Sequence, residues 1–279
     1  MEEPSFNRLA ILGLGLIGGS FALAAREHGL AKDIVAFDPN LETIAEASVL
    51  GIIEQGFSSA LDAVYEADAV ILAAPVRAIL RLLPEVAPQL SEGVFVMDLG
   101  STKRAIVAAM NELPEHVRAV GGHPMAGKEV AGFAAAEPTL FMGATFALCP
   151  TARTDGRARE LAETVANALG ARPLWTEAEA HDEAVARISH LPYLMAAALA
   201  HAAAPEGLSR SLASTGYRDT SRLAMSEPTM MLDILMTNPA PLRAALAQAS
   251  EALAILDAFL EAGDESGLRA WMESAQQRR

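Results

Sequence analysis

The first part of the chain alternates short apolar runs with longer amphipathic stretches. The runs at 33–38 (DIVAFD) and 68–76 (DAVILAAPV) are apolar at nearly every central position, which is typical of strands buried on both faces. Between such runs lie helical patterns, and the pattern NLETIAEASVLG begins at a favourable N-cap, Asn40, and stops at Gly51. Strands separated by helices predict a mostly parallel sheet with helices on both faces. We therefore predict an α/β domain over residues 1–176.

The pattern changes after residue 176, where the strand signal ends and alanine and leucine dominate. Apolar residues recur at three- and four-residue steps within 241–262, the period of an amphipathic helix, at Leu246, Ala249, Leu253, Leu256 and Leu260. We predict an all-helical C-terminal domain over residues 177–279. Helices this rich in alanine bury much of their surface by packing closely, so we expect this domain to form a homodimer interface.

Composition and charge narrow the classes of partner. The chain has 279 residues, of which 52% are hydrophobic, enough to bury one large core or two moderate ones. Its net charge is −14, from 21 basic and 35 acidic residues, and it contains no long basic run. We therefore expect neither nucleic acid nor an anionic membrane surface as a partner, and an anionic substrate would need a local arginine. No segment has the ~18 uninterrupted apolar residues of a membrane span.

Two features bear on the cellular compartment. The single cysteine, Cys149, lies in the apolar run ATFALCP and cannot form an internal disulfide, which fits a reducing compartment. The apolar segment 9–25 superficially matches an export signal, but glycines interrupt it, and the preceding residues carry Glu2 and Glu3 against Arg8. We expect a cytoplasmic protein.

The motif GLGLIG follows an apolar strand and opens a helix. Its glycines, Gly13, Gly15 and Gly18, permit a tight turn, let the backbone approach a pyrophosphate and let helix and strand pack closely. Leu16 and Ile17 complete the turn, where the N-terminus of the helix offers N–H groups to an anion. The pattern predicts a Rossmann-type dinucleotide site, and the alternative is a glycine-rich turn in an ordinary α/β protein.

Asp38 supports the dinucleotide interpretation. It ends the next predicted strand, twenty residues after Gly18, where a carboxylate can bind both ribose hydroxyls of the adenosine half. Pro39 and Asn40 follow it, so no arginine is present there to bind a 2′-phosphate. NAD is therefore favoured over NADP.

Three later strand ends supply candidate site residues, because ligands bind at the carboxyl ends of strands in such sheets. The small residues Ala74 and Pro75 would let the nicotinamide half lie against the backbone. Ser101 follows DLG and is either a functional hydroxyl or only the N-cap of the next helix. His123 lies on a short Gly-Pro loop, where an imidazole is well placed for proton transfer near neutral pH; the alternative is a surface histidine.

The helical part adds further candidates. His190 precedes a proline in the otherwise apolar RISHLPYLM, and is either a satisfied core histidine or part of a site. In STGYRDTSRLA, Asp219 and Arg222 are three residues apart and can pair on one helical face. They form either an exposed salt bridge or an arginine fork held for a substrate carboxylate.

The remaining histidines are expected to have no chemical role. His28, His116 and His201 lie in helix or turn contexts, and we predict that His181 and Asp182 form a surface or capping pair. No cluster of Cys, His and carboxylate residues has the spacing of a structural or catalytic metal site, so we expect no metal.

Taken in order, the motifs LGLGLIGGS, DLGSTK, GGHPMAG, ISHLPY and GYRDTSRLA resemble those of the prephenate and arogenate dehydrogenase family of tyrosine biosynthesis, across nearly the whole chain. The resemblance implies a dinucleotide-binding domain followed by a helical domain that dimerises. It also implies an oxidative decarboxylation, in which hydride leaves the hydroxyl-bearing carbon of a cyclohexadiene for NAD⁺ while carbon dioxide departs and the ring becomes aromatic. No mutase domain before residue 8 and no regulatory domain after about residue 275 is expected.

The resemblance also implies roles for five residues. His123 would take the hydroxyl proton, which requires a neutral imidazole in the resting enzyme. Ser101 would hydrogen-bond the same hydroxyl or the histidine. Arg222 would bind a substrate carboxylate, with Asp219 fixing its fork. His190 would hydrogen-bond the substrate side chain, where a keto group (prephenate) or an amino group (arogenate) distinguishes the two substrates.

Some positions depart from the family pattern. Lys128 follows HPMAG where serine is common, and Met230 and Met231 stand where the family often has tryptophan. Which substrate is physiological, and whether tyrosine inhibits, stays open. Two alternatives remain: a β-hydroxyacid dehydrogenase, although residues 183–279 lack the lysine which that class uses, and a non-enzymatic dinucleotide sensor, which would not need the candidate site residues to converge.

Overall fold

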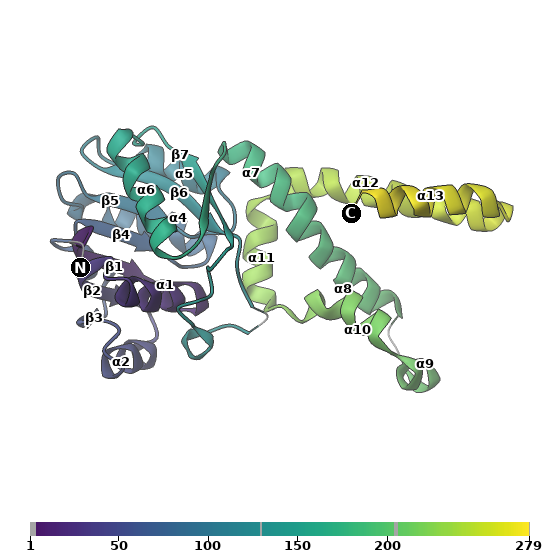
Figure 1. Cartoon of the computed structure of the whole chain (residues 1–279), viewed down its shortest axis with the longest axis horizontal. Helices are drawn as coiled ribbons and strands as arrows, with labels where there is room; N and C mark the ends of the chain where they lie inside the picture. The colour runs from purple at the N-terminus through teal and green to yellow at the C-terminus, as the bar shows by residue number, and fades with distance from the viewer. Residues whose placement is uncertain (1–3, 129, 204–205, 279) are drawn as a thin grey trace.

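The computed structural model describes residues 4–128, 130–203 and 206–278. A half that contains one eight-stranded sheet leads into a helical half that projects away from it (Figure 1). The strands are β1 (Phe6–Leu12), β2 (Ala31–Phe37), β3 (Gln55–Phe57), β4 (Ala69–Leu72), β5 (Phe95–Asp98), β6 (Arg118–Pro124), β7 (Thr145–Pro150) and β8 (Arg172–Trp175).

The strand order brings the predicted site residues together. The order across the sheet is β3-β2-β1-β4-β5-β6-β7-β8. Every neighbouring pair is parallel except β6 with β7, where His123 stands opposite Ala147. The predicted mostly parallel sheet is therefore confirmed. Because β1, β4, β5 and β6 are neighbours, their carboxyl ends lie along one edge of the sheet.

Helices cover both faces of the sheet. They are α1 (Leu16–Glu27), α2 (Leu41–Val49), α3 (Ala60–Val64), α4 (Val76–Val86), α5 (Arg104–Asn111) and α6 (Gly156–Ala168), with 3-10 turns η1 (Ala87–Gln89) and η2 (Phe133–Ala135). One core lies under α1, α2 and α6, and the other under α3, α4 and α5. In β1, Leu9 and Ile11 belong to the first core and Ala10 and Leu12 to the second. This alternation explains why the strands are apolar at nearly every position.

Local signals set the helix ends. Asn40 is the N-cap of α2, and its side chain accepts a hydrogen bond from the Glu42 amide, as the sequence predicts. The longest helix, α12, ends at Gly263, which adopts the left-handed conformation that favours glycine (φ 62°).

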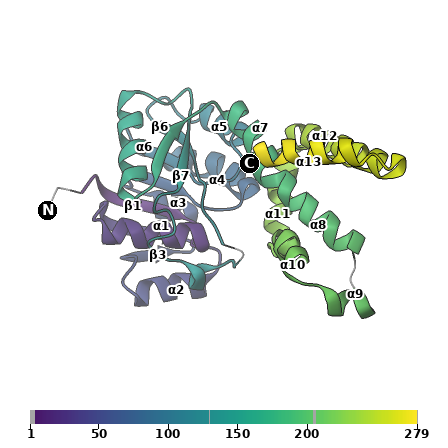
Figure 2. The same cartoon turned by 45° about the vertical axis from the view of Figure 1, so that its right-hand side comes forward.

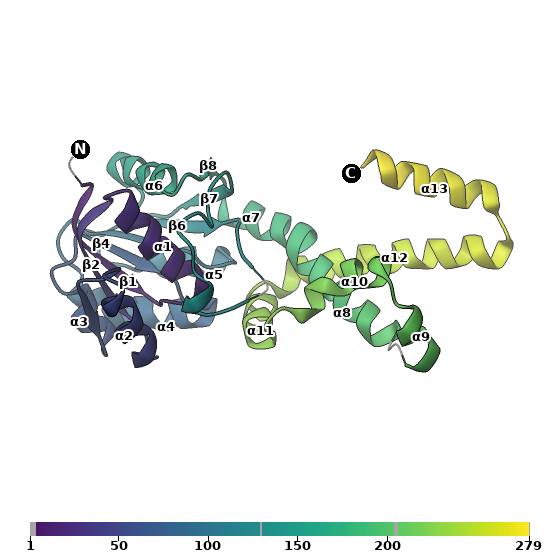
Figure 3. The same ribbon diagram turned by 60° about the horizontal axis from the view of Figure 1, so that its bottom comes forward.

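The part after residue 176 consists of helices joined by short connections and has no strand among its described residues, which confirms the predicted helical C-terminal region. Its elements are α7 (Ala178–Val185), a π-helical turn η3 (Ala186–His190), α8 (Leu191–Ala203), α9 (Gly207–Leu212), α10 (Thr215–Ser221), a 3-10 turn η4 (Arg222–Met225), α11 (Pro228–Thr237), α12 (Pro239–Ala262) and α13 (Glu265–Gln277). Figure 2 shows α11 at the junction with the sheet-containing half, and Figure 3 shows α12 and α13 as an antiparallel pair that extends away from it.

The apolar stripe of α12 is largely exposed in the single chain. Leu246, Leu253 and Leu260 are 40%, 53% and 67% exposed, whereas Leu242 and Ala245, near the start of the helix, are buried. An exposed apolar stripe of this kind is typical of a surface that another protein chain covers. In the described part of the chain, no helix combines the length and the apolar character that crossing a membrane requires.

Candidate functional site

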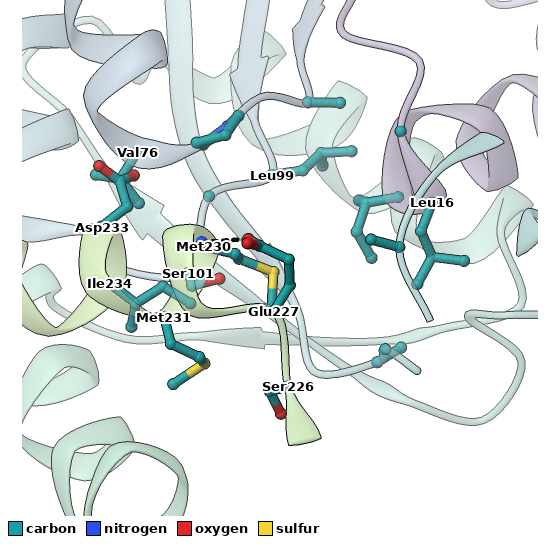
Figure 4. A pocket seen from close by; sticks show the side chains of 18 of the residues that line it. Leu16, Val76, Leu99, Ser101, Ser226, Glu227, Met230, Met231, Asp233 and Ile234 are labelled. Atoms are coloured by element: carbon teal, nitrogen blue, oxygen red, sulfur yellow. Dashed lines mark hydrogen bonds between the residues drawn. The ribbon is translucent and has the colours of Figure 1, made fainter. Parts of the chain in front are cut away.

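A cavity of about 580 Å³ lies where the two halves meet. The turn between β1 and α1, the carboxyl ends of β4, β5 and β6, and helix α11 all contribute to its wall (Figure 4). Eight of the predicted site residues line it: Gly15, Leu16, Ile17, Ala74, Pro75, Ser101, His123 and His190. Elements from both halves thus meet at one ligand-sized space.

The glycine turn has the shape that an anion needs. A Cβ atom on Gly13 would lie 2.5 Å from the Ala73 carbonyl oxygen, and one on Gly18 would lie 1.9 Å from the Gly13 carbonyl oxygen, so neither position has room for a side chain. Gly15 has no heavy atom within 4 Å of its Cβ position and lines the cavity. No side chain caps the N-terminus of α1, so its N–H groups could bind a phosphate.

Asp38 lies beside this turn and outside the cavity wall. Its carboxylate accepts hydrogen bonds from the Leu14 amide at 2.7 Å and the Asn40 amide at 2.8 Å. These contacts hold the end of β2 against the glycine turn, next to the position that the ribose of a dinucleotide occupies in this fold.

His123 comes from the end of β6 and reaches the cavity. The Nδ1 atom of its half-buried ring lies 2.8 Å from the Nε2 atom of His181. Burial lowers the pKa of His123 well below its usual value, and the nearby His181, Lys103 and His190 lower it further. The imidazole is therefore neutral near pH 7 and able to accept a proton.

The prediction that His181 and Asp182 lie at the surface is wrong, but its capping alternative holds for Asp182, which accepts the Lys103 and Arg104 amides at the start of α5. Both residues are buried, at 4% and 1% exposure, and the Nδ1 atom of His181 lies 2.8 Å from the Asp182 carboxylate. The physical reason is helical spacing: Ala178, His181, Asp182 and Val185 form the buried face of α7. That spacing is visible in the sequence and could have revealed their burial.

His123 lies within strand β6, not on the predicted loop, because Gly121, Gly122, His123 and Pro124 pair with β7, and a buried ion pair supports this end of the strand. The ammonium group of Lys103 donates to the Asp98 carboxylate, and also to the Gly122 carbonyl oxygen at 2.6 Å, and both charged side chains are fully buried. Asp98 in turn accepts the Gly122 amide at 3.1 Å. The sequence analysis did not predict a role for Lys103. Lysine is almost never fully buried without a partner, so a lysine close to the end of an apolar strand could have indicated a buried ion pair.

Ser101 and His190 also line the cavity. Ser101 is not the N-cap of α5, since that position belongs to Lys103; its side chain lies among the cavity residues in Figure 4. His190 is buried in the π-helical turn, and burial, aided by His181 and opposed by Asp182, lowers its pKa to about 4. π-Helical turns often occur at functional sites.

Arg222 and Asp219 lie on the exposed surface of α10 and η4, outside the residues that line the cavity. The chain re-enters the wall immediately afterwards, at Ser226 and Glu227, so the pair stands close to the cavity along the sequence. The structure therefore brings the other catalytic and substrate-binding candidates to one cavity and leaves these two beside it.

The departures from the family pattern also lie at the cavity. Met230 and Met231 of α11 form part of an apolar wall (Figure 4). The ammonium group of Lys128 lies 2.8 Å from the Glu137 carboxylate and donates to the Ala135 carbonyl oxygen at 3.0 Å. Lys128 therefore ties the loop after β6 to the segment around η2. Among the described residues, no group of three or more His, Cys, Asp and Glu side chains could hold a metal ion.

Comparison with known proteins adds family evidence. The family profile "Prephenate dehydrogenase, nucleotide-binding domain" matches residues 21–174, and "Prephenate dehydrogenase, dimerization domain" matches residues 177–274. The chain is 37% identical over 238 residues to the prephenate dehydrogenase of Bacillus subtilis (strain 168), which covers 83% of this chain and 64% of that protein. The chain thus spans just under two thirds of the length of that relative.

Two solved structures are similar over nearly their whole length. The Aquifex aeolicus prephenate dehydrogenase, in complex with hydroxyphenyl propionate and NAD⁺, has a TM-score of 0.92 and 30% identity, with 100% of this chain and 99% of that chain covered. The Synechocystis arogenate dehydrogenase has a TM-score of 0.83 and 29% identity, with 98% of each chain covered.

Proposed function

Because the chain belongs to the prephenate dehydrogenase family, we propose that it catalyses the NAD⁺-dependent oxidative decarboxylation of prephenate, or of its amino analogue arogenate, in tyrosine biosynthesis. One observation carries this proposal: a single cavity is lined by the open glycine turn of α1 and by the neutral imidazole of His123. The cavity thus combines an anion-binding turn with a proton acceptor. The family match argues against the β-hydroxyacid dehydrogenase and sensor alternatives.

The first turn fits NAD. The uncapped N-terminus of α1 would receive the pyrophosphate over Gly15, with Gly13, Leu16, Ile17 and Gly18 shaping the turn. When bound, NAD⁺ supplies the hydride acceptor.

Two further contacts would fix the orientation of the cofactor. Asp38, already oriented by two backbone amides, would accept hydrogen bonds from the ribose hydroxyls. Ala74 and Pro75, which follow β4 and line the cavity, would present only small side chains to the nicotinamide half.

The residues at the ends of β5 and β6 would carry the chemistry. In this proposal the Nε2 atom of His123 accepts the proton of the substrate hydroxyl as hydride leaves the same carbon. Ser101 hydrogen-bonds that hydroxyl and holds it toward the histidine. His190, kept neutral by burial, hydrogen-bonds the substrate side chain.

The helical half would recognise the substrate and form the dimer. Arg222, oriented by Asp219, would bind a substrate carboxylate, because the cavity wall otherwise offers, among its described residues, only Lys128 as a cation. We propose a division between the two domains at residues 176 and 177, with a homodimer formed through the exposed stripe of α12. A cytoplasmic location is proposed as well, supported by the free thiol of Cys149, whose pKa burial raises to about 12.

The deciding experiment follows NADH absorbance with prephenate or arogenate, each with NAD⁺ or NADP⁺. We expect turnover with NAD⁺ and a clear preference for one of the two acids. A purified, folded protein that binds NAD⁺ but turns over neither acid would overturn the proposal.

A further inference from the structure

A row of hydrogen bonds runs from His123 into the protein, away from the cavity. It passes through His181 and ends at the Asp182 carboxylate. We propose that His181, held by Asp182, is a positioning residue that fixes the tautomer of His123, so that its Nε2 atom carries no proton and is free to act on the substrate. The inference rests on the proposed function, because it assumes that His123 receives the hydroxyl proton.

The direction of the row is set at its inner end. The Asp182 carboxylate accepts the backbone amides of Lys103 at 2.7 Å and Arg104 at 2.9 Å, at the N-terminus of α5. Burial opposes ionisation of this carboxyl, but the hydrogen bonds from His181, Arg104 and Lys103 outweigh it and lower its pKa. An ionised carboxylate can only accept hydrogen bonds, so the Nδ1 atom of His181 must carry the proton.

The next contact follows from the first. The proposal takes His181 as neutral, so that with its proton on Nδ1 it has only a lone pair on Nε2. The 2.8 Å contact from this Nε2 to the Nδ1 atom of His123 needs one proton between the two atoms, so His123 must supply it. A neutral His123 with its proton on Nδ1 has an unprotonated Nε2. The row therefore selects the tautomer that a base needs.

Without His181 this selection would be lost. A neutral imidazole in water favours the Nε2–H form, in which the nitrogen that faces the substrate is blocked. The row also supports the charged state: when His123 gains a proton, its bond to His181 becomes charge-assisted, and Asp182 supplies negative charge at the far end. This support matters because burial of the ring is the largest cause that disfavours a positive charge on His123.

The hydrogen-bonded residues are held in place by elements from both halves of the molecule. His123 belongs to β6, whereas His181 and Asp182 belong to α7, so the two halves of the molecule meet in this contact. The two imidazole rings meet edge to face, with centroids 5.1 Å apart. The side-chain amide of Asn238 also donates to the Asp182 carbonyl oxygen at 2.7 Å, so α7 is held from both sides.

The test compares two variants of the full chain. His181→Phe keeps a ring but removes both nitrogens, and we expect it to lower kcat by roughly 10²–10³-fold with the KM and the NAD⁺ affinity within about threefold of wild type. The side chain of His181→Gln can still accept a hydrogen bond from Nδ1–H of His123 through its amide oxygen. We therefore expect the kcat of His181→Gln to be at least about tenfold higher than that of His181→Phe. A His181→Phe protein with kcat within about threefold of wild type would overturn the inference, as would two variants that lose the same activity.

The tautomer can also be measured directly, whether or not the enzyme turns over. With ¹⁵N-labelled histidine and saturating NAD⁺, long-range ¹H–¹⁵N spectra report which ring nitrogen carries the proton; the signals of His123 are those lost in His123→Asn. We expect Nδ1–H in the wild type and the Nε2–H form in His181→Phe. Nε2–H in the wild type would refute the inference and the use of Nε2 as the base, whereas NADH formation with either acid would still support the proposed reaction. Nδ1–H in a protein without turnover would confirm the row and refute the function.

Discussion

The two sides of the cavity are built in opposite ways. On the sheet side, Lys103 and Asp98 are buried, and each of them has partners at hydrogen-bond distance. On the helical side, Asp219 and Arg222 are exposed on short helical segments. Buried and mutually bonded groups keep one geometry, whereas exposed side chains on short helices can adjust to a ligand or to a second chain. The contrast matches the proposed function, in which His123 on the sheet side carries the proton transfer and Arg222 on the helical side binds the substrate carboxylate.

The largest effect is expected where the sheet side meets the substrate. His123→Asn removes the proton acceptor, so kcat should fall by roughly 10²–10⁴-fold, because general base catalysis contributes about that much. The NAD⁺ dissociation constant, measured by calorimetry, should stay within about threefold, since the glycine turn is untouched. A near-normal kcat in this variant would show that His123 is not the base, and would contradict the assignment of the chemistry to the sheet side.

The buried ion pair should show its importance in stability. Lys103→Met leaves the Asp98 carboxylate buried without its partner, and removing one member of a buried pair costs about 3–5 kcal/mol. Unfolding in urea should show this loss, and Lys103→Met/Asp98→Asn should recover part of it. Lys32→Met is the matched control, because Lys32 is exposed and its loss should cost less than about 0.5 kcal/mol. Equal stability of the Lys103 and Lys32 variants would mean that the pair does not hold the site.

Stability should also fall in acid, through the buried imidazole of His190. The pKa of His190 is about 4 in the folded protein, below the usual value of 6.5. Between these two pH values the imidazole is protonated in the unfolded chain but not in the folded chain. The free energy of unfolding therefore declines as the pH falls from 6.5 toward 4, and His190 lowers it by roughly 2 kcal/mol at pH 4.5.

The matched pair for this measurement is His190→Gln and His28→Gln. Urea unfolding at pH 7 and pH 4.5 should give a smaller difference for His190→Gln than for the wild type. His28 is exposed, so His28→Gln should keep the wild-type difference. An unchanged difference in His190→Gln would show that another group controls the acid sensitivity.

The sequence predicted the sheet side well where the signal is local. The glycine turn, the N-cap Asn40 and the strand-end position of His123 depend on residues adjacent in the chain. It failed where the burial of a side chain depends on how neighbouring strands lie in the sheet. The burial of Lys103 is tolerable only because Asp98 ends β5 and the Gly122 carbonyl comes from β6.

His181 shows a different kind of failure. Its burial follows from helical spacing with Ala178 and Val185, which the sequence displays, but the neighbouring aspartate suggested an exposed pair. Its partner, His123, lies 58 residues away, so the contact itself could not be predicted from spacing. Local chemistry was sufficient to predict His123 as a candidate base, and tertiary packing was needed to find the residue that we propose orients it.

The smallest effect is expected on the helical side, and it tests the other half of the comparison. If Arg222 binds a substrate carboxylate, Arg222→Ala loses a charge-assisted hydrogen bond of about 1.5–3 kcal/mol, which raises the KM roughly 10- to 100-fold. The kcat should change by less than about threefold, because the group acts equally on the ground state and the transition state. Arg222→Lys should recover part of the affinity but not the bidentate geometry. Arg218→Ala, which removes an exposed arginine on α10, should leave both constants near wild type. If Arg222→Ala instead lowered kcat at unchanged KM, the division of labour between the two sides would be wrong, because an exposed helical residue would then act on the transition state alone.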